Sequence, residues 1–404
     1  MALEFSAYYT LICAAVVLII GSFLVRKVPL LNNFNIPEPV AGGLVAALVC
    51  FGIYEFTGFR VSFDAELQNA FMLVFFSSIG LSANFSKLKA GGRALLLFLL
   101  VIVVYIGVQN TVGISMAKLL GLDPLIGLVA GSITLLGGHG TAGAWGAVLE
   151  HEHGVKGAVT LGIACATFGL VIGGLVGGPL AKWLIRRNGL RGPVADGNGD
   201  SDESAMPNFS SPHKNRLITA EAAVETLALF AGCLAFAQFM TELTAESSFK
   251  LPTFVWALGG GVIIRNMLDY VFRFEVFDRA IDVFGNASLS IYLAIALLSL
   301  KLWELADLAG PLVVILAVQT LVLLLYVAFV TFRVMGKDYD AAVLCAGNCG
   351  FGMGATPTAV ANMQAITNQY GSSYKAFLIV PMVGAFFIDI LNAVFIQFFL
   401  KFLS

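Results

Sequence analysis

Charged side chains are scarce in this sequence. Asp, Glu, Lys and Arg make up 12% of its 404 residues, where a soluble domain has about 25%. Apolar residues amount to 58%, and a water-soluble fold of this size needs far more polar surface to cover its core. The composition therefore excludes a soluble globular protein and predicts a chain surrounded by a lipid bilayer. The formal net charge of −2 gives no reason to expect nucleic acid as a partner.

Motifs for enzymatic chemistry are also lacking. The six cysteines fall in apolar stretches without metal or disulfide spacing, and no nucleophile stands beside a base. The Gly350-x-Gly352-x-Gly354 spacing lacks the strand and helix of a dinucleotide site. The His and Glu residues at 150–153 have no fourth-ligand spacing and are interpreted as a solvated edge. We expect no enzyme, no cofactor and no transition-metal site.

Ten apolar runs are long enough to cross about 30 Å of hydrocarbon. They occupy residues 9–25, 40–56, 67–83, 94–119, 157–185, 220–240, 254–270, 281–300, 311–332 and 376–399. The first run has an acidic leader and no small-residue cleavage site, so it is interpreted as a retained span and not a signal peptide. Two further segments, 124–149 and 341–366, are interrupted by glycine clusters and are predicted to re-enter the membrane from one side.

The positions of Lys and Arg favour one orientation. With the N-terminus outside and both interrupted segments re-entrant, most of the 23 basic residues lie on the cytoplasmic side, as membrane insertion favours. If either segment crossed the membrane, this bias would weaken. We therefore predict a multi-pass protein of the bacterial inner membrane with both termini periplasmic. The polar stretch 186–218 contains too few apolar residues to fold a core and is predicted to be a cytoplasmic linker between domains 1–185 and 219–404.

The two halves have matching landmarks. Five spans per half make the second half enter from the opposite face, and Gly138 follows Pro37 at nearly the spacing with which Gly352 follows Pro252. At these points stand Leu135-Leu-Gly-Gly-His-Gly-Thr-Ala142 and Gly350-Phe-Gly-Met-Gly-Ala-Thr-Pro357. Paired, glycine-interrupted segments in inverted repeats are typical of secondary transporters. The predicted fold is all-α: ten transmembrane helices in two inverted five-helix repeats, each with a glycine-rich re-entrant segment.

Interrupted helices at membrane depth require protein or water to satisfy their backbone. After each cluster a helix begins inside the membrane, and two converging helix N-termini favour an anionic ligand. The alternative interpretation is tight helix packing through small residues. The matched positions of the clusters, flanked by Thr, Asn and His, favour a binding site.

The sequences of these two clusters resemble a known family. Gly137-Gly-His-Gly-Thr-Ala142 with Trp145 and Gly146, and Gly347-Asn-Cys-Gly-Phe-Gly-Met-Gly-Ala-Thr-Pro-Thr358, resemble the paired signatures of bacterial sodium/glutamate symporters, and the resemblance covers nearly the whole chain. It implies import of L-glutamate driven by Na⁺, a homodimer, and an elevator-type movement of a transport domain against a scaffold.

Substrate ligands are expected in the two clusters and at Asp389, a costly carboxylate deep in the last span. The threonine hydroxyls either cap helices or contact substrate. His139 either orients its loop as a neutral donor or allows proton coupling. The predicted substrate-binding residues are Gly138, His139, Gly140, Thr141, Asn348, Gly352, Met353, Gly354, Ala355, Thr356, Thr358 and Asp389.

Sodium prefers hard oxygen ligands, as calcium and magnesium do. Asp389 could supply one, or pair with a substrate ammonium, or make a structural hydrogen bond, and Asn392 follows it by about one turn. Gln109 and Asn110 interrupt the fourth run and Ser77 the third; each could serve a sodium site or bond across helices. The predicted sodium-binding residues are Ser77, Asn110, Asp389 and Asn392.

Two other functions remain open. A citrate or dicarboxylate transporter on the same scaffold should present additional buried arginines, and none is visible in mid-span. An ion channel usually arranges identical filters around an axis, whereas this chain has two dissimilar loops.

Overall fold

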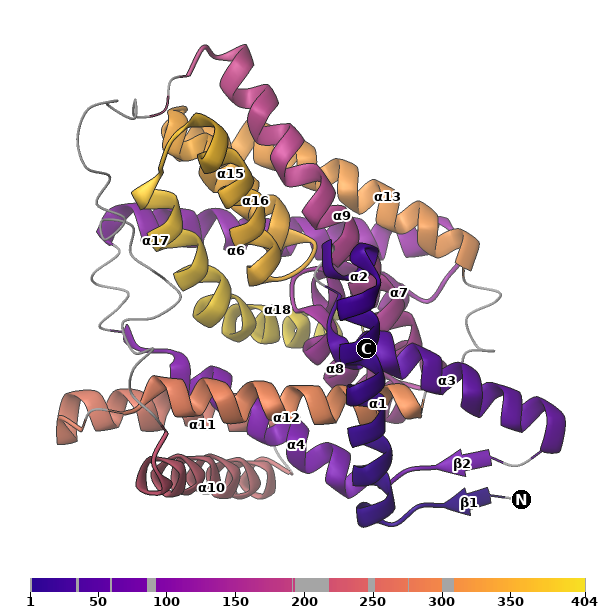
Figure 1. Ribbon diagram of the computed structural model, residues 1–404. Coiled ribbons are helices and arrows are strands. Elements are labelled where there is room, and N and C mark those ends of the chain that lie inside the picture. Colours follow the sequence, from indigo (N-terminus) through magenta and orange to yellow (C-terminus); the bar gives the residue numbers. More distant parts are fainter. Residues whose placement is uncertain are drawn as a thin grey trace.

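The computed structural model describes residues 2–33, 36–58, 60–85, 92–190, 192, 218–245, 251–274, 276–299 and 309–403. Within them the chain is almost entirely helical (Figure 1). The first half contains β1 (Ala2–Glu4), α1 (Ala7–Lys27), α2 (Pro29–Asn33), α3 (Glu38–Thr57), β2 (Arg60–Ser62), α4 (Ala65–Ser82), α6 (Gly92–Leu119), α7 (Pro124–Leu128), the π-helical turn η1 (Val129–Ile133), α8 (Gly138–His153) and α9 (Ala158–Arg187). The prediction of an all-α protein is confirmed apart from the parallel pair β1 and β2, which the sequence did not predict.

The second half begins after the predicted polar linker, which lies outside the described residues from 193 to 217. It contains α10 (Ala220–Leu243), α11 (Thr253–Met267), η2 (Leu268–Phe272), α12 (Asp278–Leu298), α13 (Ala309–Tyr326), η5 (Val327–Thr331), α14 (Phe332–Val334), α15 (Tyr339–Gly352), α16 (Thr356–Tyr370), α17 (Tyr374–Met382), η6 (Val383–Phe387) and α18 (Ile388–Leu403).

Seven helices in the described part of the chain are long and apolar enough to cross a membrane. They are α1, α3, α6, α9, α10, α12 and the continuous stretch from α13 to α14. The other three predicted spans coincide with α4, which starts with several polar residues, and with α11 and α17–α18, which π-helical turns interrupt. The chain is thus an all-α, multi-pass membrane protein.

The helices pack in two groups. We call α1, α3, α4, α10, α11 and α12 the frame group, because α4 packs against α11 and α12, α3 against α1 and α12, and α10 against α11. The hairpin group contains α6 to α9 and α13 to α18, in which α9 packs against α8, α15 and α16, and α6 against α7, α13 and α18. The two groups lie in the lower and the upper part of Figure 1. They touch at several places, including α8 with α12, η6 with α4 and α18 with α11.

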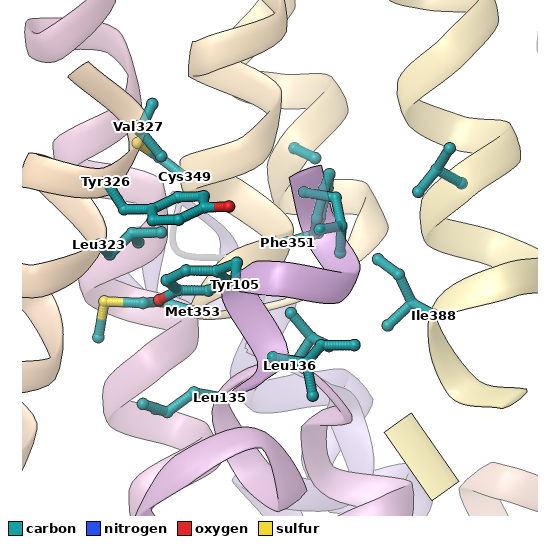
Figure 2. Packing of buried hydrophobic residues seen from close by; sticks show 14 of the residues in the cluster. Tyr105, Leu135, Leu136, Leu323, Tyr326, Val327, Cys349, Phe351, Met353 and Ile388 are labelled. Carbon is teal, nitrogen blue, oxygen red and sulfur yellow. The ribbon is translucent and has the colours of Figure 1, made fainter. Parts of the chain in front are cut away.

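Aromatic and aliphatic side chains fill the centre of the hairpin group (Figure 2). The rings of Tyr105 on α6 and Tyr326 on α13 lie 5.1 Å apart between centroids, and the Tyr326 hydroxyl donates to the Val101 carbonyl at 2.6 Å. Leu136 and Phe351, which come from the two interrupted segments, belong to the same cluster. This core therefore holds both interruptions next to α6 and α13.

Arg265 near the end of α11 lies in a polar cluster that the sequence did not reveal. It is only 4% exposed. Its guanidinium pairs with Asp269 at 3.0 Å and with Asp278 at the start of α12, and it donates to the Leu81 carbonyl of α4. A buried charge needs such partners. Arg265 consequently joins three helices of the frame group.

Candidate functional site

Both glycine clusters interrupt helices, and the two interruptions meet. The chain turns at Leu136 and Gly137 between η1 and α8, and at residues 353–355 between α15 and α16. A Cβ atom built on Gly138 would lie 3.6 Å from the carbonyl oxygen of Gly354. Gly138 itself has φ +65°, a left-handed conformation that glycine adopts at little cost. Segments more than 200 residues apart in sequence thus come together, as the paired clusters predict.

Two helices begin at this meeting point without side-chain caps. The residues that precede α8 and α16, Gly137 and Ala355, make no capping hydrogen bond. By contrast, the neighbouring helices α15 and α17 are capped by Asp338 and Ser373. Uncapped N-terminal amides carry the positive end of the helix dipole and suit an anion. Gly137, Gly138, Ala355 and Thr356 are partly accessible.

Asp389 lies on a stretch of chain that contacts both interrupted segments. A Cβ atom on Gly384, in η6, would lie 2.8 Å from the Thr356 hydroxyl at the start of α16. Asn392, further along α18, donates to the Ser132 carbonyl of η1 at 2.8 Å. Asp389 stands between these two contact points and is only partly accessible. Within the described residues it has no ion pair or hydrogen bond, which is unusual for a carboxylate in a membrane span.

His139 is buried, and its Nε2 lies 3.0 Å from the Thr167 hydroxyl on α9. That hydroxyl donates its own proton to the Ile163 carbonyl at 2.8 Å, so it accepts from the histidine. The imidazole is therefore protonated at Nε2, and His139 anchors the first turn of α8 to α9. This geometry matches the interpretation of His139 as a donor that orients its loop.

Gly140 and Thr141 are buried in the first turn of α8, and the other predicted substrate residues lie around the second turn. Met353 and Gly354 are buried in the turn, and the Gly352 carbonyl accepts from Gln109 Nε2 at 3.0 Å. Asn348 donates to the Thr331 hydroxyl at 2.9 Å. Buried acceptors that lack a partner here are Asn348 Oδ1 and Thr358 Oγ1.

The structure separates the predicted sodium ligands. Asn110 Oδ1 accepts from the Ser132 amide at 2.9 Å, and Asn392 bonds the carbonyl of the same residue, so these two asparagines come together. Ser77 does not join them. It lies on α4 in the frame group, where its hydroxyl donates to the Leu73 carbonyl at 2.8 Å and its own carbonyl faces Gly261 of α11.

A cavity of about 680 Å³ lies between the frame and hairpin groups. Its lining residues come from α4, α8, α10, α11 and α18, and include Asn69, His151, Thr241, Gln397 and Lys401. Trp145 of α8 stacks edge-on against Phe254 of α11 at 5.3 Å, and Phe254 contacts Phe76 of α4 at 4.7 Å. Of these three rings, Phe254 lines the cavity.

The histidines and acids at 150–153 belong to the last turn of α8. Glu150 Oε1 accepts from the Val159 amide at 2.9 Å and so supports the start of α9. His151, Glu152 and His153 line the cavity. No metal-binding group of three His, Cys, Asp or Glu residues occurs in the described part of the chain.

A model of the sodium/glutamate symporter family matches residues 3–372. This chain belongs to the sodium/glutamate symporter family. It is 50% identical over 398 residues to a sodium/glutamate symporter of Haemophilus influenzae, with 98% of each chain covered. It is 52% identical over 392 residues to one of Escherichia coli K12, with 97% of this chain and 96% of that one covered. The resemblance of the two glycine clusters to this family is confirmed.

Two buried polar residues of this symporter-family chain, Ser132 and Gln319, escaped the predicted site, and Gln109 was considered for a sodium site but was not among the predicted ligands. Around η1, Gln319 Nε2 donates to the carbonyl of Gln109 and reaches that of Ala130, and the Ser132 amide donates to Asn110, which follows Gln109. Gln319 is the amide-bearing residue of the apolar run 311–332, and Ser132 precedes the first glycine cluster. An amide inside an apolar run was the available signal. The sequence did not show that residues so distant would share one contact region.

Proposed function

We propose that this protein is a secondary active transporter that imports L-glutamate together with Na⁺. The observation that carries the proposal is the meeting of the two interrupted segments, Gly138 beside Gly354, at two uncapped helix N-termini. The family and its relatives named sodium/glutamate symporters supply the identity of substrate and ion.

The site suits an amino acid with two carboxylates. The N-termini of α8 and α16 offer amides to carboxylate groups, and Asp389 offers a negative charge to the ammonium group. A citrate or dicarboxylate has no ammonium group and would meet repulsion from an ionised Asp389. The unpaired carboxylate therefore favours glutamate over the alternative substrate on the same scaffold.

The packing supports an inverted repeat of ten spans with domains 1–185 and 219–404. If α1, α3 and α4 correspond to α10, α11 and α12, the contact of α3 with α12 corresponds to that of α11 with α4. The contact of α1 with α12 likewise corresponds to that of α10 with α4, and both pairs occur. The hairpins α7–α8 and α15–α16 occupy equivalent places in the two halves and would re-enter the membrane from opposite faces.

We further propose that transport follows an elevator-type mechanism in which the hairpin group moves against the frame group. In the inner membrane, with both termini periplasmic, the cavity between the groups would open outwards at the end of α8. The frame group would form the homodimer, because α1 and α10 leave most of their apolar surface exposed.

Uptake of radiolabelled L-glutamate into proteoliposomes tests the proposal. We expect accumulation that requires an inward Na⁺ gradient. Replacing Asp389 with Asn should weaken glutamate affinity about 10- to 100-fold, because a charged hydrogen bond contributes roughly 1.5–3 kcal/mol. Glu225→Gln, on an exposed position of α10, is the matched control and should leave uptake unchanged. Accumulation driven by a proton gradient alone, or uptake of citrate but not glutamate, would contradict the proposal.

A further inference from the structure

Five buried amide and hydroxyl side chains meet at η1, from both halves of the chain. Asn110 and Asn392 bond the amide and the carbonyl of Ser132. Gln319 Nε2 donates to the Gln109 carbonyl at 2.8 Å and reaches the Ala130 carbonyl at 3.4 Å. All five residues are at most 1% exposed. Between Ala130 and Ser132 the backbone leaves the helical path at Gly131 (φ −106°, ψ −134°).

Four of these side chains leave an oxygen atom without a partner. The unpartnered atoms are Gln109 Oε1, Ser132 Oγ, Gln319 Oε1 and Asn392 Oδ1. The three amides cannot be turned around, because each NH₂ group donates to a backbone carbonyl, which only accepts. The atoms left free are therefore oxygens. A buried polar atom without a partner is costly, and a cluster of such atoms needs an explanation.

The chemistry of this cluster fits a monovalent cation. Hard cations take oxygen ligands, and sites for divalent ions use carboxylates, whereas the four free oxygens here are uncharged. Asn110 differs from the others: its Oδ1 is used by Ser132, and its unpartnered atom is the donor Nδ2. Asn110 is thus a positioning residue that orients Ser132.

The cluster also reaches the candidate substrate site. Gln109 Nε2 donates to the Gly352 carbonyl, immediately before the second turn. A cation on Gln109 Oε1 would fix this side chain and with it the carbonyl that borders Gly354. The same cation would join η1 and α6 to α13 and α18. Occupancy of the cluster would therefore order the substrate site, which is a coupling between two ligands.

We propose that Gln109, Ser132, Gln319 and Asn392 bind Na⁺ through their free oxygens. This inference rests on the proposed function, because Na⁺ is the coupling ion there. It adds three residues to the predicted sodium ligands and moves Asn110 to a supporting role.

Binding of ²²Na⁺ to the purified full-length protein, without glutamate, tests the site. Ser132→Ala removes only a hydroxyl that has no partner, so a purely structural serine would tolerate the change. We expect at least about a tenfold rise in the Na⁺ concentration for half-saturation, as for loss of one buried polar contact. Ser132→Cys keeps the volume but offers soft sulfur, and should weaken Na⁺ binding similarly. Thr111→Val, at an exposed neighbour of Asn110, should leave binding unchanged.

The outcomes separate the site from the function. If wild-type and both Ser132 variants bind ²²Na⁺ alike while glutamate uptake remains Na⁺-driven, the site is wrong and the transport function stands. If the wild-type protein binds no ²²Na⁺, the site is also wrong, and glutamate uptake without Na⁺ would then remove the proposed coupling ion.

Discussion

The contact between α8 and α12 allows a sharp test of how the two helix groups meet. A Cβ atom on Gly143 would lie 2.3 Å from the hydroxyl oxygen of Tyr292 and 3.1 Å from its ring carbon Cζ. Tyr292 is only 1% exposed, and its hydroxyl has no hydrogen-bond partner. The hydroxyl cannot be accommodated beside an alanine without a shift of α8, α12 or the ring.

Gly143→Ala should therefore destabilise the protein through overpacking, by about 1–3 kcal/mol. This cost opposes the gain of roughly 1 kcal/mol that alanine brings to a helix interior. Tyr292→Phe alone should be nearly neutral, because the lost hydroxyl makes no hydrogen bond. In the double variant the nearest atom is Cζ, so most of the overpacking cost should disappear. We expect a favourable coupling of about 1–2 kcal/mol between the two substitutions.

Thermal unfolding of the four proteins in the same detergent measures this coupling. Gly52→Ala is the control, since a Cβ atom at this position of α3 meets nothing within 4 Å, and it should stabilise slightly. If Gly143→Ala behaved like Gly52→Ala, α8 and α12 would not approach as closely as described. If the two substitutions were additive, the hydroxyl would not be the atom in conflict.

Three further changes test other parts of the structure. Asn362→Ala should cost about 1–3 kcal/mol, because Asn362 Nδ2 donates to the Gly173 carbonyl of α9 and reaches a carbonyl of α15; unchanged thermal stability would contradict this. Arg265→Met removes the cation that pairs with two acids of the frame group and should cost roughly 3–5 kcal/mol. The measurement is thermal stability, and Arg333→Met, at an exposed position, is the control. In Gly138→Ala the added Cβ atom meets only an ordinary van der Waals contact, so the expected cost of about 1–2 kcal/mol comes from the left-handed backbone at this position. We expect glutamate affinity to fall about tenfold, and full affinity would argue against a site at this turn.

Hydrophobic runs and glycine clusters in the sequence predicted much of this fold. The predicted spans coincide with helices. The two glycine clusters coincide with the turn between η1 and α8 and the turn between α15 and α16. Both signals are local, since a span needs a continuous apolar run and an interrupted helix needs residues that tolerate unusual backbone.

Residues whose role depends on distant contacts were harder to predict. Ser77 and Asn110 looked equivalent, as polar residues within apolar runs, yet Ser77 faces α11 and Asn110 faces η1. Gln319 and Arg265 gained their importance from partners on other helices. Helix periodicity gives little help here, because spans in lipid lack the polar face that marks the exposed side of a soluble helix.

Inside each helix group, several glycines bring the backbones of neighbouring helices into direct contact. Within the frame group, Cβ atoms on Gly21 and Gly80 would strike backbone oxygens of neighbouring helices at 1.9 and 2.1 Å. Within the hairpin group, Gly169 would strike the Met353 carbonyl at 2.0 Å, and Gly350 would strike the backbone of α16 at 2.4 Å. Such backbone contact is the tightest that membrane helices make. Each group is thereby held together by contacts that small rearrangements would break.

Across the boundary, the glycines of α8 meet side chains instead. Gly140 faces the ring of Phe75 and the methyl of Leu289, and Gly143 faces Tyr292. On its other side α8 is fixed to its own group, because Gly146 would strike the backbone of Val159 at 2.8 Å. Side chains can change rotamer, whereas packed backbones cannot give way. If the hairpin group moves against the frame group, as proposed, this boundary is where side chains could rearrange without a clash between backbones.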